Sequence, residues 1–335
     1  MVAVASAPTD EARPTLLRRL DGVQRRSAFL SFGVGVVKKY GEDSGAKQAA
    51  LLTYYGFLSS IPLLLIVVWA ASGILRDDPQ LRDDFINSLV PEQLTDAVTS
   101  ALAAMPTSPL PLIVGIAGLL YTGNGIVFTA YDVLNQLQAV PYRDRFTFVP
   151  KYLRAFATLL VILFGVVLLG LVIVGSSAVN GGIVGTGLMV MGAWVVLSVM
   201  LLVSVALLSV RRNTWRGAWP AAILGGAVLA VVILVGGVAL STFVARSGAV
   251  YGSFAVVVGI FSLLYLVSQA LVFSGEVAVV RRRHLWPRAL MAMNPTEADQ
   301  RALALRVGIE QRSEADQVVV SVRNEPAPDK ATDGR

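Results

Sequence analysis

A stretch of 56 residues, from 155 to 210, contains no Asp, Glu, Lys, Arg or His. The hydrocarbon core of a bilayer accommodates a helix of about 20 apolar residues, so this stretch is long enough to cross a membrane twice. Small residues over 175–182 allow the chain to reverse direction between the two crossings. The stretch therefore predicts a membrane protein.

The amino-acid composition agrees with a membrane protein. Hydrophobic residues make up 55% of the chain and charged residues 15%, whereas a soluble domain carries about 25% charged residues. A soluble core could not bury this excess of apolar side chains. The chain has no cysteine, which excludes disulfides, thiolate nucleophiles and cysteine metal sites.

Six apolar segments are long enough to span a bilayer as helices. They are continuous apolar runs, whereas the strands of a membrane barrel are about 10 residues long and alternate in polarity. We predict an all-α polytopic membrane protein with six transmembrane helices, in a membrane domain over residues 46–283. The predicted spans are 49–75, 109–136, 153–175, 186–210, 217–245 and 250–280.

Basic residues are distributed unevenly over the connecting segments. Of the 28 Lys and Arg, 25 lie in the N-terminal arm, the loops after the second and fourth spans, and the C-terminal tail, which all share one side. Because short cytoplasmic loops carry an excess of Lys and Arg, we expect both termini to be cytoplasmic. The net charge of +6 then reflects topology and contact with membrane lipids, and no nucleic-acid partner is expected.

The cytoplasmic arm, residues 1–45, is predicted to contain an interfacial amphipathic helix. Apolar residues between 16 and 37 share one helical face, and arginines occupy the other faces, where they would meet anionic headgroups. Lys38 and Lys39 follow this segment in place of a small-residue cleavage site, which argues against a signal peptide.

Two further polar segments lie outside the spans. The outer loop, 76–108, carries six acidic residues against two arginines, and its apolar periodicity predicts short amphipathic helices. This loop is either a solvated cap or a docking surface for an envelope protein. The cytoplasmic tail, 284–335, is mostly polar, and we expect it to be largely disordered.

Few residues of the chain are suited to catalysis. His284 is the one histidine and lies beside an arginine cluster, so a histidine triad or a site with several histidine ligands is excluded. No glycine-rich segment leads into a Lys-Ser/Thr pair, as a phosphate-binding loop would. We therefore expect no catalytic residues, no metal and no cofactor.

Three of the spans carry polar residues along one helical face. Lipid excludes such faces, so they are expected to meet inside the bundle as an interior polar path. The candidate residues of this path are Tyr55 and Ser59 in the first span, Asn124, Tyr131, Asp132 and Asn135 in the second, and Tyr265, Gln269 and Glu276 in the sixth.

Asp132 and Glu276 are the two carboxylates within the predicted spans. Intramembrane carboxylates commonly mark substrate or proton paths. A structural role is the alternative: Glu276 would pair with Arg154, or with the arginine cluster that begins at Arg281, and would fix helix ends without any part in transport. The sequence leaves both interpretations open.

Several of these positions resemble the YihY/BrkB family of bacterial inner-membrane proteins, over roughly residues 16–283. The segments that carry the resemblance are 48–55 (QAALLTYY) with 59–62 (SSIP), Asn135 followed by Arg143, Arg145 and Phe146, and 251–253 (YGS) followed by Tyr265, Gly275 and Glu276. The resemblance implies a multi-pass protein of the bacterial plasma membrane with both termini inside. The family was formerly labelled ribonuclease BN-like, but nuclease chemistry generally needs metal-held carboxylates or acid-base histidines, so we expect no ribonuclease activity.

These observations favour an envelope protein that transports or hands over a lipid or another amphipathic substrate. The alternative is a non-transporting scaffold for envelope machinery, and a membrane enzyme is the third hypothesis. A homo-oligomer, a substrate, a direction and a coupling ion are all left open by the sequence.

Overall fold

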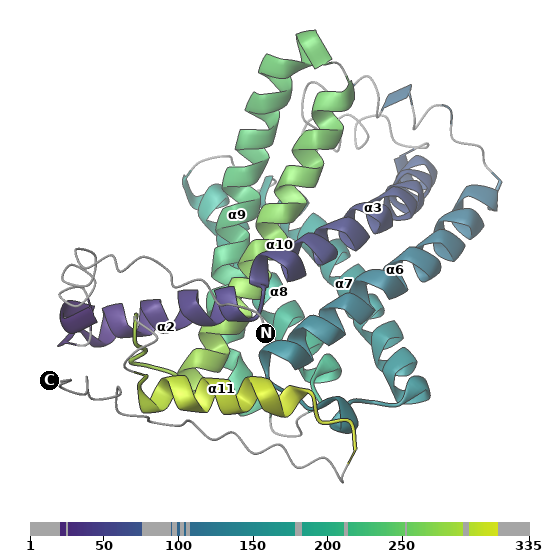
Figure 1. Cartoon of the computed structure of the whole chain (residues 1–335). Helices are drawn as coiled ribbons and strands as arrows, with labels where there is room; N and C mark the ends of the chain where they lie inside the picture. The colour runs from purple at the N-terminus through teal and green to yellow at the C-terminus, as the bar shows by residue number, and fades with distance from the viewer. Residues whose placement is uncertain are drawn as a thin grey trace, which may run out of the picture.

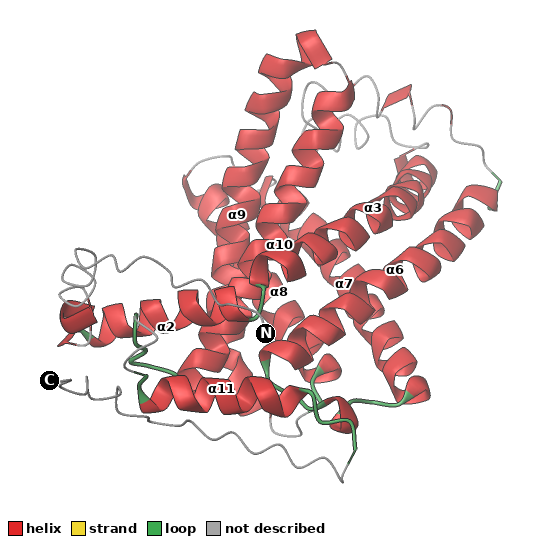
Figure 2. Ribbon diagram, viewed as in Figure 1, coloured by secondary structure: helices red, strands yellow, loops and turns green. Residues whose placement is uncertain are grey.

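The computed structural model describes residues 21–75 except 25, 108–177, 183–210, 214–251, 253–290 and 295–313, with a few single positions between 95 and 104. Within these ranges the chain forms helices and short loops and no strand (Figure 2). The elements are α2 (Ala28–Glu42), α3 (Gly45–Leu75), α6 (Leu110–Leu137), the short 3-10 helix η2 (Tyr142–Asp144), α7 (Phe148–Ser177), α8 (Ile183–Leu208), α9 (Thr214–Tyr251), α10 (Ser253–Arg283) and α11 (Glu297–Ile309).

Six of these helices, α3 and α6 to α10, are long and apolar enough to cross a membrane. The prediction of an all-α protein with six helices able to span a membrane is thereby confirmed. Most of the outer loop and the tail from residue 314 onward lie outside the described residues. The predicted loop helices and the end of the tail are therefore not among the elements above.

The spans pack in a sequence of neighbours. Helix α3 packs on α6, α7 on α8, α8 on α9, α9 on α10, and α10 returns to α3. In Figure 1, α9 and α10 run side by side towards the top, while α3 and α6 form a second pair that leads away to the right. Helices α2 and α11 cross the lower end of the bundle, which we call the α11 end.

Apolar side chains cover the outside of the spans. Phe164, Met191 and Val235 are each at least 60% exposed. In the most apolar part of each span, only 11% to 22% of the residues are buried within the protein. Water would disfavour such a surface, whereas lipid tails match its polarity. The span surfaces are therefore the lipid contacts of this protein.

Gly226 allows α9 to approach α8 closely. A Cβ at this position would lie 2.8 Å from the backbone nitrogen of Ser198, so Gly226→Val is expected to separate the two helices at a cost of about 1–3 kcal/mol. Thermal unfolding of the purified protein in detergent measures this loss. Gly237→Val, in the same helix but with no atom within 4 Å of its Cβ position, is the matched control. An equal loss in both variants would show that the valine itself, rather than the contact, is responsible.

Candidate functional site

Helix α2 positions the charged residues of the site. Ser27 caps its N-terminus by accepting a hydrogen bond from the backbone N–H of Leu30 at 3.4 Å. One face of the helix packs against α10, and a Cβ on Gly35 would lie 2.8 Å from the carbonyl oxygen of Leu285. The buried positions of this face are Ser31, Gly35, Val36 and Lys39.

The opposite face of α2 is apolar and uncovered. Phe29 is 85% exposed and Val37 63%, and Leu30 is also exposed. Leu30 and Val37 belong to the apolar face that the sequence predicts for an interfacial helix. Their exposure is what such a helix needs in order to reach lipid while its other face holds the bundle.

Lys39 reaches into the bundle and joins two carboxylates. Its Nζ donates to Glu276 Oε2 at 2.8 Å, to the carboxylate of Asp43, and to the carbonyl oxygen of Leu137 at 3.2 Å. Glu276 is fully buried, and Lys39 and Asp43 are each 9% exposed. The second oxygen of Glu276, Oε1, has no hydrogen-bond partner in the described part of the chain. We call Lys39, Asp43 and Glu276 the Lys39 cluster.

A chain of polar side chains begins beside this cluster. Tyr40 donates its hydroxyl to Gln269 Oε1, and Gln269 Nε2 donates to the hydroxyl of Tyr265 at 2.6 Å. Burial raises the pKa of the Tyr40 phenol above its usual value, and the net shift stays upward although the hydrogen bond to Gln269 lowers it. The Tyr40 phenol is therefore neutral at physiological pH and can donate the hydrogen bond that Gln269 Oε1 accepts.

Tyr265 ends this chain at an open groove between α3 and α10. The groove has a volume of about 470 Å³ and is lined by Ala50, Phe261, Ser262, Tyr265 and Leu266. Phe261 and Leu266 are 43% and 52% exposed, so the groove faces outward, and most of its lining is apolar. An apolar surface with one phenol among its lining residues suits a molecule with a hydrocarbon part and a polar end.

The predicted residues of α6 lie in a different part of the bundle from the groove. Asn135 is fully buried, and its Nδ2 donates to the carbonyl oxygens of Tyr131 at 2.8 Å and Leu208 at 3.2 Å. The Tyr131 hydroxyl accepts from the backbone N–H of Phe146 at 2.8 Å. Both side chains therefore fix the end of α8 and the loop before α7, away from the Lys39 cluster.

Asp132 does not lie in the interior. Its side chain is 53% exposed, and it faces Arg145 Nη1 at 3.6 Å and Lys151 Nζ at 3.5 Å. The prediction of an interior path is wrong for this residue. One residue advances a helix by about 100°, so the burial of Tyr131 and Asn135 on one face turns Asp132 outward.

The predicted ion-pair partners of Glu276 are also wrong. Arg154 donates to the carbonyl oxygen of Leu207 at 3.3 Å and lies over the Phe146 ring at 3.8 Å, and Arg281 is exposed. Glu276 pairs with Lys39 instead, because α2 folds back onto α10. The spacing of Lys39 and Asp43, four residues apart, signals only their own pairing within α2.

The remaining predicted residues lie where α3 meets α6. Ser59 donates to the carbonyl oxygen of Tyr55 at 2.8 Å, and the Tyr55 ring fills the space left by Gly125. Asn124 is half-buried, and its side chain makes no hydrogen bond to the described residues. The nine predicted residues thus fall into separate places: Glu276 belongs to the Lys39 cluster, and Gln269 and Tyr265 are linked to Tyr40 beside it.

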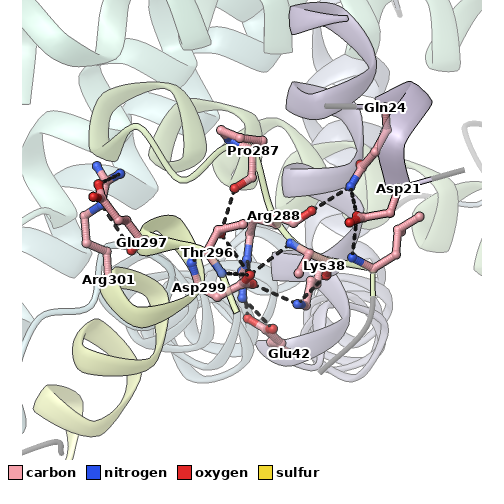
Figure 3. Close-up of polar contacts among 12 residues, drawn as sticks. Asp21, Gln24, Lys38, Glu42, Pro287, Arg288, Thr296, Glu297, Asp299 and Arg301 are labelled. Atoms are coloured by element: carbon pink, nitrogen blue, oxygen red, sulfur yellow. Dashed lines mark hydrogen bonds and ion pairs between the residues drawn. The ribbon is translucent and has the colours of Figure 1, made fainter. Parts of the chain in front are cut away.

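A second charged network holds α11 against α2 (Figure 3). The Arg288 side chain is 3% exposed; it donates to both oxygens of Glu42, at 2.8 and 3.0 Å, and to Asp299 at 2.8 Å. Lys38 donates to the same Asp299 oxygen at 2.8 Å. We call Lys38, Glu42, Arg288 and Asp299 the tail lock.

Asp299 is the centre of the tail lock. Burial acts to raise its pKa, but hydrogen bonds from Lys38, from the backbone of Thr296 and Ala289, and from Arg288 prevail, so its pKa lies well below the usual range. Asp299 and Thr296 also form a capping box at the start of α11. A lowered pKa contributes stability above the unfolded-state value, and this contribution is lost only as the pH falls through the folded-state value. Asp299 of the tail lock therefore stays charged in mildly acidic solution.

The prediction of a largely disordered tail is wrong for residues 284–290 and 295–313. This part folds back onto α2 through the tail lock and forms α11. Its end also reaches the loop after α6, where the backbone N–H of Arg143 donates to the carbonyl oxygen of Gln311 at 3.1 Å. Charge pairing orders this segment together with a small apolar cluster, in which Leu285 and Ala302 pack against Val36 of α2 and Val280 of α10.

Six apolar helices around a buried charged cluster define a multi-pass integral membrane protein. A family model described as Virulence factor BrkB matches residues 36–298, and the chain belongs to this family, which confirms the resemblance to YihY/BrkB proteins. The chain is 25% identical to the inner membrane protein YhjD of Escherichia coli (strain K12) over 163 residues, 46% of this chain and 48% of that relative. The alignment thus spans about half the length of YhjD. No solved structure matches the chain.

Proposed function

We propose that this protein transports or hands over a lipid or another amphipathic molecule at the bacterial plasma membrane, with the groove between α3 and α10 as its contact surface. The carrying observation is the hydrogen-bonded chain of Tyr265, Gln269 and Tyr40, which leads from the groove to the residue next to Lys39 in α2. The inner-membrane name of YhjD and the family resemblance support the location.

The two parts of such a ligand would occupy chemically different surfaces. A hydrocarbon chain would lie against Ala50, Phe261 and Leu266, which remain accessible from the lipid side. The polar end would meet the Tyr265 hydroxyl, which can donate and accept hydrogen bonds. This task requires no covalent chemistry, so the proposed role is not enzymatic.

The proposal includes the orientation of the chain. Among the described residues, the Lys and Arg of α2, of the loop after α6 and of the last turn of α10 lie at the end that carries α2 and α11. The positive-inside rule supports placing this end, with both termini, in the cytoplasm. The exposed apolar face of α2 would then rest in the inner leaflet, beside the α11 end of the bundle.

Filling the groove tests the proposal. Ser262→Trp is expected to reduce the transfer of fluorescently labelled phosphatidylglycerol between the leaflets of proteoliposomes, because the indole would occupy the space between α3 and α10. Thr242→Trp is the matched control: Ser262 and Thr242 are both exposed, and each donates its hydroxyl to the carbonyl four residues earlier at 2.8 Å.

The expected order is full transfer by wild type and Thr242→Trp, and transfer by Ser262→Trp reduced towards the level of protein-free vesicles. Wild-type protein that moves no more probe than empty vesicles would contradict lipid transfer for this probe class. Full transfer by Ser262→Trp would contradict the groove as the route.

A further inference from the structure

We propose that the Lys39 cluster is a proton-binding site, with Glu276 Oε1 as the atom that takes up the proton. The inference deepens the proposed function, on which its role in transport rests, by naming a coupling ion. It begins from charge balance. The cluster holds two carboxylates and one ammonium, so with all three groups ionised it is one proton short of neutrality.

Burial makes this missing proton significant. Glu276 is fully buried, and one of its oxygens lacks a hydrogen-bond partner among the described residues. An unpaired charge away from water is costly, and so is an unsatisfied polar atom. A proton bound on Oε1 would remove the excess charge and turn the unsatisfied acceptor into a hydroxyl.

No other described charge satisfies Glu276. The ionisable groups that face it from α2 are Lys39, Asp43 and Tyr40. Helices α3 and α6 contribute the apolar side chains of Ala49, Leu52, Val133 and Leu137, together with the Leu137 carbonyl. On α9, the described side chains between Ala218 and Leu240 include no ionisable group.

The proton has a polar approach to the cluster. Tyr265 lines the groove, and Gln269 follows it one helical turn later. Tyr40, the neighbour of Lys39 in α2, donates its hydroxyl to Gln269. A hydronium ion that enters along these groups would transfer its proton to Glu276 and leave as water. The O–H bond that forms replaces the one that breaks, and no oxidant or reductant takes part.

Proton uptake would change how α2 is held. With Glu276 neutral, Lys39 would keep its charged partner Asp43, four residues away on the same helix. The ion pair between α2 and α10 would be lost, and deprotonation would restore it. The site would thus switch the link between α2 and the helix that lines the groove, in a sense set by pH.

Infrared difference spectroscopy of the full-length purified protein tests proton binding without any substrate. A pH step is expected to change a protonated-carboxyl C=O band that shifts in D₂O, and Glu276→Gln is expected to remove this band. Asp132→Asn, at an exposed carboxylate, should leave it in place. The glutamine variant is expected to fold, because its amide can still accept from Lys39 and Asp43 alone balances the ammonium.

The outcomes separate this inference from the proposed function. Persistence of the band in Glu276→Gln, or its absence from wild type, overturns proton binding at Glu276 whether or not the protein moves lipid. Loss of the band in Glu276→Gln alone supports the site. A wild-type protein that shows the band and moves no probe would retain the proton site and contradict lipid transfer for this probe class.

Discussion

Replacement of Lys39 by methionine is expected to lower the free energy of unfolding by about 3–5 kcal/mol, the usual cost of removing one partner of a buried ion pair. Methionine matches the length of the lysine stem but leaves Glu276 and Asp43 buried together with no cation. The loss should grow as the pH rises, because both carboxylates are then ionised. Unfolding of the detergent-solubilised protein, followed by circular dichroism at several pH values, measures it.

A double variant isolates the cause of this loss. Lys39→Met combined with Glu276→Leu removes both charges of the interhelical pair, and buried pairs replaced by apolar residues of similar size often retain stability. The double variant should therefore be more stable than Lys39→Met alone. Lys38→Met is the neighbouring control, because Lys38 is 33% exposed and pairs outside the bundle. If Lys38→Met cost as much as Lys39→Met, burial would not be the reason.

The six spans could be predicted from sequence because the length of an apolar run is a local property. Residues 155–210 and the other runs exclude charge over a bilayer's thickness, and no tertiary contact is needed to recognise this. The polar character of Tyr265, Gln269 and Glu276 was visible for the same reason. What these side chains contact was not, since the partners come from α2.

Lys39 shows why the Lys39 cluster could not be predicted from the sequence. In the sequence it adjoins Lys38, and both appear as surface cations after an interfacial helix. The two side chains point to different places: Lys38 joins Asp299 in the tail lock, and Lys39 joins Glu276 inside the bundle. Only the docking of α2 on α10 distinguishes them. The partners are 237 residues apart, a separation at which local patterns carry no information.

The polar residues of α6 show the converse error, in which polar side chains were assigned to a ligand path. Tyr131, Asp132 and Asn135 were grouped by their polarity and their depth in a span. Their hydrogen bonds depend on Phe146 and Leu208, which lie at the ends of other elements. Polarity on a helix face predicts that partners exist, but it does not tell whether they are a ligand path or the backbone of a neighbouring loop.

Arg288→Met is expected to release α11 from α2 while leaving the spans folded. The substitution removes the guanidinium that joins Glu42 to Asp299, and two carboxylates then share the single remaining cation, Lys38. Breaking such a pair costs about 3 kcal/mol, or roughly a 100-fold fall in protection of the α11 amides from hydrogen exchange. Hydrogen–deuterium exchange mass spectrometry over 297–309 measures this fall.

The reason for a local effect is the position of the tail lock outside the spans. Arg288 contacts the arm and the tail, whereas the spans are held by their own apolar clusters, so exchange within α7 and α8 should not change. Arg301→Met is the matched control, because Arg301 is 49% exposed and lies 4.0 Å from Glu297, where an ion pair contributes little. Unchanged protection of α11 in Arg288→Met would show that the tail lock does not hold this helix, and a fall across all the spans would show that the lock supports the whole bundle.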